Sequence, residues 1–131
     1  MESSASVKSS QAAAQPDKQV VSANGASSLV LRWQGQDIAV PASDEMLFGI
    51  GAATENELQL LGQFVSRFHA VLRWHRNGFD LIDRSTNGVF VQLEDAQVRF
   101  VHRRSFRLWG SGYVSFGEPL NESNFLSFRN A

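Results

Sequence analysis

The stretch FVSRFHAVLRWHRNGFDLIDRSTNG, residues 64–88, decides the fold. It contains two runs with the composition of β-strands, residues 70–76 and 79–83. Asn77 and Gly78 stand between them, and this dipeptide is the strongest short signal for a type I′ hairpin, because both turn residues need a positive φ angle. The sequence therefore predicts an antiparallel hairpin that turns at Asn77 and Gly78.

Two polar segments flank this hairpin. Ser66-Arg67-Phe68-His69 precedes it, and Arg84-Ser85-Thr86-Asn87-Gly88 follows it. An antiparallel hairpin brings its two outer ends together. We therefore expect these segments to lie side by side at one edge of the sheet.

The chain on both sides of the hairpin continues as short apolar runs separated by turns. Further strands are expected at residues 29–33, 36–40, 46–50, 57–60, 89–93, 98–102, 105–108, 112–116 and 124–128. Short strands with turn signals about every 8 to 12 residues, and no run of helical period, are typical of an all-β sandwich. We predict two sheets with about ten to eleven strands in total.

Residues 1–27 differ from the rest in composition. They are rich in Ser, Ala and Gln and nearly devoid of large apolar side chains. Such a segment cannot bury enough surface to offset the entropy lost on ordering. We predict a flexible leader or linker at residues 1–27 and one domain at residues 28–131.

The composition excludes several classes of protein and site. The chain has no cysteine, so disulfides and thiolate metal sites are excluded, and no apolar run is long enough to cross a membrane. The three histidines lack the spacing of metal ligands, and no cofactor motif is present. The start lacks the pattern of a secretory signal, so we expect a cytoplasmic protein.

Catalysis is not expected. Ser66 and His69 lie three residues apart, which could suit a nucleophile and its base. However, the chain shows no nucleophile elbow, and a triad also needs an orienting acid. We therefore do not expect an enzyme.

Charge is distributed unevenly along the chain, although the net charge is only −1. Residues 29–61 contain one arginine and five acids, whereas residues 62–107 contain eight arginines and four acids. The planar guanidinium suits carboxylate or phosphate, although many such arginines are simply solvated. Nucleic-acid binding is not expected, since the net charge is negative and aromatic and basic residues do not alternate.

The polar segments and their spacing resemble the forkhead-associated (FHA) family of phosphothreonine-binding modules. That family has Gly-Arg, a short strand, Ser-Arg-x-His-Ala, an Asp and Ser-x-Asn-Gly. This chain has Gly51-Ala52, the run 56–60, Ser66-Arg67-Phe68-His69-Ala70, Asp83 and Ser85-Thr86-Asn87-Gly88. The resemblance spans about residues 29–129 and implies two twisted sheets with the ligand loops at one end. Ala52 departs from it by replacing the family's arginine.

The resemblance also implies roles for individual residues. The predicted ligand contacts are five residues of the polar segments: Ser66, Arg67, Arg84, Thr86 and Asn87. Arg67 is included as the only cation of the first segment, and Arg84 as a substitute cation because it lies next to both segments. The residues expected to support the structure of the site are Gly51, His69 and Gly88. Without the resemblance, we would interpret Ser66 as an ordinary serine in a turn.

We therefore predict a non-catalytic module of intracellular signalling that recognises phosphothreonine peptides. The only threonines are Thr54 and Thr86, both in the predicted ligand loops, so the phosphothreonine must belong to another protein. The alternative is a phosphate-independent docking, dimerisation or regulatory domain, because Ala52 has removed a phosphate-binding cation. Residues 107–117 resemble, more weakly, FHA domains attached to bacterial nucleotide cyclases. Whether the chain forms a homo-oligomer is left open.

Overall fold

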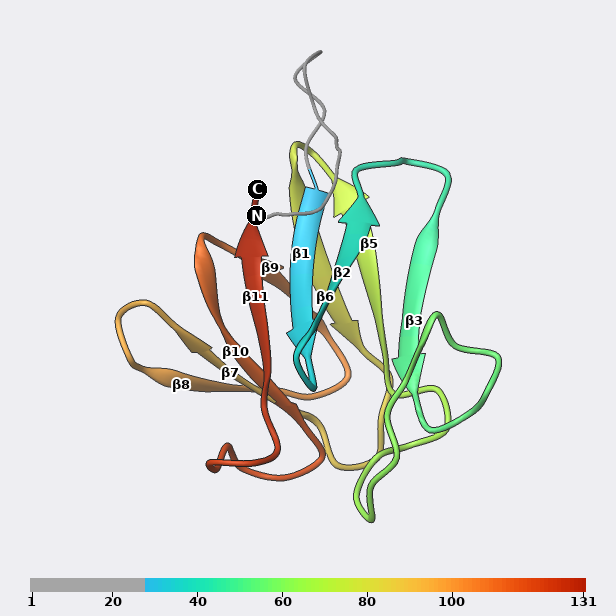
Figure 1. The fold of residues 1–131 in the computed structure, drawn as a ribbon, viewed down its shortest axis with the longest axis vertical. Coiled ribbons are helices and arrows are strands. Elements are labelled where there is room, and N and C mark those ends of the chain that lie inside the picture. Colours follow the sequence, from blue (N-terminus) through green and yellow to red (C-terminus); the bar gives the residue numbers. More distant parts are fainter. Residues whose placement is uncertain (1–27) are drawn as a thin grey trace.

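Two β-sheets pack face to face in the computed structural model, which describes residues 28–131 (Figure 1). No helix occurs within these residues. The eleven strands are β1 (Ser28–Trp33), β2 (Gln36–Pro41), β3 (Leu47–Gly51), β4 (Leu58–Gln59), β5 (Ala70–His75), β6 (Gly78–Asp83), β7 (Val89–Leu93), β8 (Val98–Val101), β9 (Ser105–Leu108), β10 (Ser111–Phe116) and β11 (Leu126–Asn130). The predicted all-β sandwich is confirmed. The leader predicted for residues 1–27 lies outside the described residues.

The sheets differ in size. The larger has six strands in the order β2-β1-β11-β10-β7-β8, and the smaller has five in the order β4-β3-β5-β6-β9. All neighbours are antiparallel except β3 and β4, which are parallel. Alternate side chains of β1, β5 and β7 are buried. The side chains buried between the sheets include Leu29, Leu31, Leu72, Leu81 and Val91. This alternation is what the strand-like runs of the sequence predict.

The central hairpin forms, but its turn lies one residue earlier than predicted. Arg76 and Asn77 have φ angles of 51° and 61°, and His75 pairs with Gly78. This register places Trp74 opposite Phe79 with their ring centroids 5.0 Å apart. A turn at residues 77–78 would instead pair Phe79 with Arg76. Cross-strand aromatic packing therefore outweighs the preference for glycine in the turn.

The last strand also begins later than predicted, at Leu126 rather than Asn124. The side chain of Asn124 donates to the carbonyl of Pro119 and accepts from the N–H of Asn121. Asn124 thus closes a turn and does not join the strand, as asparagine side chains often do.

The loops that follow β3, β4 and β6 gather at one end of the sandwich, at the bottom of Figure 1. β3 and β6 run toward this end, and β5 and β7 leave it. The C-terminus lies at the opposite end (Figure 1). We call the segments 52–57, 60–69 and 84–88 together the loop end.

Candidate functional site

Backbone hydrogen bonds lock the three loops together. The N–H of Ala52 donates to the carbonyl of Ser66 and that of Ala53 to the carbonyl of Arg67, both at 3.0 Å. The N–H of Arg84 donates to the carbonyl of His69 at 2.9 Å. The two polar segments that flank the central hairpin therefore lie side by side, and the loop after β3 joins them.

Gly51 lies where the end of β3 approaches the backbone of the 60–69 loop closely. A Cβ atom at this position would strike the carbonyl oxygen of Arg67 and lie 2.8 Å from the amide nitrogen of His69. Any side chain would therefore push the 66–69 segment away from β3. Asn56 reinforces the same contact, since its side-chain amide donates to the carbonyls of Ala53 and Arg67 at 2.9 and 2.8 Å. Asn56 was not among the predicted site residues, because an asparagine in a loop carries no signal of its own in the sequence.

His69 connects the 60–69 loop to the 84–88 loop from the interior. Its imidazole is fully buried. Nδ1 accepts the N–H of Ser66 at 2.9 Å, so Nε2 carries the proton that is donated to the carbonyl of Gly88 at 2.8 Å. The ring edge packs against Phe116, with centroids 5.4 Å apart. One side chain thus fixes two loop backbones at once.

The ring of His69 is held in its neutral form. Burial lowers the pKa of His69 below its usual value, against the opposing effects of the Gly88 carbonyl and the Asp83 carboxylate. Protonation would also place a proton on Nδ1, where the Ser66 N–H must be accepted. The loop geometry therefore depends on a neutral imidazole.

A second buried network shapes the turn at residues 83–88. The hydroxyl of Ser85 donates to a carboxylate oxygen of Asp83 and accepts the N–H of Gly88, both at 2.7 Å. Gly88 has a φ angle of +84°, which favours glycine, and a Cβ there would strike the ring of Phe100. Asp83 and Ser85 are buried and support the turn. Both stand in the quoted sequence pattern, but neither was among the predicted site residues.

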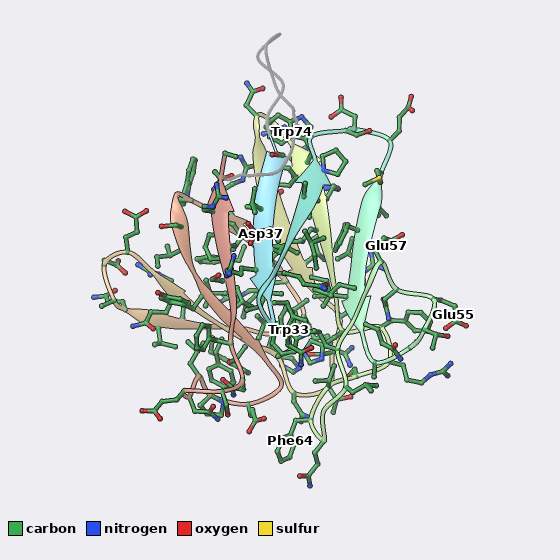
Figure 2. The ribbon with its side chains drawn as sticks, in the orientation of Figure 1. Trp33, Asp37, Glu55, Glu57, Phe64 and Trp74 are labelled. Carbon is green, nitrogen blue, oxygen red and sulfur yellow. The ribbon has the colours of Figure 1, made fainter. Side chains whose placement is uncertain are left out.

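Several of the predicted ligand residues lie close together at the surface, on the outer side of this buried network. The hydroxyl oxygen of Ser66 accepts the N–H of Thr86 at 3.2 Å. The side-chain amide of Asn87 donates to the carbonyl of Phe64 at 3.2 Å. Thr86 and Asn87 are exposed, and Phe64 lies at the tip of the loop end (Figure 2). Each contact leaves hydrogen-bonding groups of Ser66 and Asn87 available to a ligand.

The predicted cations Arg67 and Arg84 belong to the same loops, and both are exposed. Neither forms an ion pair with a carboxylate of residues 28–131. Ala52 is half-buried beside them, and its carbonyl accepts the side-chain amide of Gln59. Position 52 therefore contributes only backbone groups to the site.

Residues 28–131 contain no group of three or more His, Asp or Glu side chains arranged to hold a metal ion. The same residues include no helix of the length and apolar character needed to span a membrane.

Comparison with known proteins identifies relatives of this arrangement. Residues 48–108 match the sequence profile of the FHA domain. No curated protein sequence gives a significant match to the chain. Among solved structures, Rv1747 FHA-1 of Mycobacterium tuberculosis is 20% identical with a TM-score of 0.64, and the match covers 82% of this chain and 99% of that one.

Two further similar structures contain phosphopeptides. EmbR of Mycobacterium tuberculosis, in complex with a low-affinity phosphopeptide, is 23% identical with a TM-score of 0.58, and the match covers 82% of this chain and 26% of that chain. The MEK1 FHA domain, in complex with a phosphothreonine peptide of HOP1, is 18% identical with a TM-score of 0.56, and the match covers 77% of this chain and 94% of that chain. At these identities the similarities establish the fold.

Proposed function

The chain belongs to the FHA family through its residues 48–108, and on this premise we propose that residues 28–131 form a non-catalytic module that binds phosphothreonine peptides of other proteins. In this proposal Ser66, Arg67 and Arg84 contact the phosphate. Thr86 and Asn87 contact the phosphate or the peptide backbone beside it.

The contact between Ser66 and Thr86 is the observation that carries this proposal. Because the Ser66 oxygen already accepts the Thr86 N–H, its own proton is left to donate outward. The same contact joins the two loops that carry Arg67 and Arg84, so a hydroxyl donor is fixed close to exposed cations. A hydroxyl and guanidinium groups together are suited to phosphate, which accepts several charge-assisted hydrogen bonds.

The peptide backbone would be held by Asn87. Its side-chain nitrogen donates one hydrogen bond to Phe64, which fixes the orientation of the amide. The side-chain oxygen and the second N–H remain, so Asn87 offers one acceptor and one donor to an extended chain. That MEK1 and EmbR, which have a similar fold, are in complex with phosphopeptides supports peptide binding by this fold.

A second candidate function is phosphate-independent docking or regulation, and Ala52 favours it. At this position the site offers neither the charge nor the side-chain donors of an arginine. Under this alternative the loop end binds an unmodified protein surface. The association of residues 107–117 with nucleotide cyclases and a cytoplasmic location stay predictions.

One titration separates the two functions. The chain is titrated calorimetrically with a phosphothreonine peptide library and with the unphosphorylated library, at low and at high salt. The proposal expects binding of the phosphorylated peptides alone, and weaker binding as ionic strength rises, because exposed charges are screened. Equal binding of both libraries, independent of salt, would favour the docking alternative.

A further inference from the structure

Strand β8 is an edge strand whose outer side is not paired within residues 28–131. It is the last strand of the larger sheet and pairs with β7 alone (Figure 1). The carbonyl of Phe100 accepts a hydrogen bond from the exposed guanidinium of Arg104 at 2.9 Å, so this carbonyl points away from β7. Because backbone groups alternate in direction along a strand, the N–H and C=O groups of Val98 and Phe100 face outward, whereas those of Arg99 face β7.

Strand β7 indicates the same direction. The carbonyl of Gly88, just before β7, accepts the N–H of Gly117, which follows β10. Two residues further along, the backbone groups of Phe90 therefore also face β10. Phe100 lies opposite Phe90 and receives no backbone hydrogen bond from it, and the two rings pack closely, with centroids 4.9 Å apart.

Two apolar side chains stand on this free edge. Val98 and Phe100 lie on the same face of β8, since they are two residues apart, and their exposed fractions are 53% and 47%. Two of the other three edge strands are less suited to pairing, because β4 has only two residues and β2 ends in Pro41, which has no N–H to donate. An apolar edge with free backbone groups is a template for a further strand.

Charged groups of opposite sign stand at equal distances on either side of Arg99. Glu94-Asp95 precede it by five and four residues, and Arg103-Arg104 follow it by four and five. All four are exposed, and neither of the two following arginines forms an ion pair with a carboxylate of residues 28–131. This segment is therefore complementary to an antiparallel copy of itself, in which the acidic turn of each copy lies beside the arginines of the other.

Arg99 stands at the centre of this arrangement and lies opposite Arg99 of the second copy. Like charges directly opposite one another destabilise a sheet. Each guanidinium, however, donates to both carboxylate oxygens of Asp95 in its own chain, at 2.8 and 3.2 Å. This ion pair offsets the charge of Arg99, so the two copies of Arg99 do not prevent the pairing.

We propose that β8 pairs with β8 of a second copy of this chain, antiparallel and centred on Arg99, so that the two larger sheets join into one. Val98 of each copy lies opposite Phe100 of the other, and their free backbone groups bond to each other. The guanidinium of Arg104 leaves the carbonyl of Phe100 and turns to the acidic turn of the second copy. The pairing does not depend on the proposed function, since no residue of the loop end takes part in it.

Sedimentation velocity of the full chain tests this dimer. Only one short strand of each copy takes part, so we expect a weak dimer with a dissociation constant on the order of 100 µM, measured from about 10 µM to about 1 mM. Val98→Lys places a charge on the edge and should weaken association by about tenfold or more. Leu47→Lys is the matched control, because Leu47 is 52% exposed on β3 of the other sheet, and it should leave association unchanged. Thermal melts check that each variant is folded.

Single cysteines test the register, because the chain has no cysteine of its own. A mixture of Val98→Cys and Phe100→Cys chains should form a disulfide on mild oxidation, since opposite residues lie about 5.5 Å apart between their Cα atoms. Either variant alone places its cysteines two residues out of register, beyond the roughly 7 Å that a disulfide bridges. A parent chain that stays monomeric, equal association of the two lysine variants, or equal cross-linking in the mixture and in the single variants would overturn the pairing.

Discussion

Replacing His69 with alanine tests how the loop end is held together. The substitution removes the acceptor of the Ser66 N–H and the donor to the Gly88 carbonyl. It also removes the edge contact with Phe116. All three losses occur at a fully buried position.

The expected cost follows from these contacts. A buried polar group left without a partner costs about 1–3 kcal/mol, and an aromatic edge contact contributes about 0.5–1.5 kcal/mol. Water can enter the space left by the ring and bridge the two backbone groups, which moves the estimate toward the lower end. We expect His69→Ala to lower the free energy of unfolding by about 3 kcal/mol, and the melting temperature by on the order of 10–20 °C.

Urea unfolding of His69→Ala and of the parent measures this loss. His75→Ala is the matched control, because His75 is half-buried and its side chain makes no hydrogen bond within residues 28–131. The control should change the free energy of unfolding by about 0.5 kcal/mol or less. A loss below about 1 kcal/mol for His69→Ala, or an equal loss for the control, would refute the account of His69 as the link between the loops.

Four other predictions concern the site, its pH dependence and the domain boundary. Ser66→Ala should weaken phosphopeptide binding in calorimetry and barely change the melting temperature; a large loss of stability without loss of affinity would contradict its role as a ligand contact. Ala52→Arg should tighten phosphothreonine binding by on the order of tenfold, since a charged hydrogen bond contributes about 1.5–3 kcal/mol and exposure reduces it; an equal gain for the unphosphorylated peptide would argue against a phosphate contact. Because burial lowers the pKa of His69, the unfolded chain takes up this proton first as the pH falls. The stability due to the neutral ring should be fully present above about pH 6.5 and decline below it by up to about 1.4 kcal/mol per pH unit, and urea titrations should show this component missing in His69→Ala. Residues 28–131 expressed alone should match the full chain in melting temperature and peptide affinity; a large drop in either would show that residues 1–27 contribute.

Much of the fold could be predicted because alternation of apolar and polar residues is a local property. Runs such as residues 29–33 and 89–93 need only their own side chains to show which face is buried. The pairing of the two polar segments also followed from the chain, since a hairpin between them brings them together.

The residues of the site could be predicted only at positions where the FHA sequence pattern specifies a residue type. Ser66, His69 and Asn87 stand in such positions, and the structure brings all three to one end of the sandwich. Asn56 and Arg103 carry no comparable signal. An asparagine in a loop and an arginine in a turn are ordinary there, and their partners lie 11 and 18 residues away along the chain.

By itself the sequence determined the strand pattern and the grouping of the polar segments, because alternation and chain connectivity are enough for both. Only the tertiary structure decided the register of the central hairpin, where Trp74 packs on Phe79 and moves the turn to Arg76 and Asn77. It also decided how Arg103 is held, because its partners are the buried carboxylate of Asp83 and a backbone carbonyl in the turn after β6. Such contacts depend on the packing of elements far apart in sequence, which no local pattern of residues encodes.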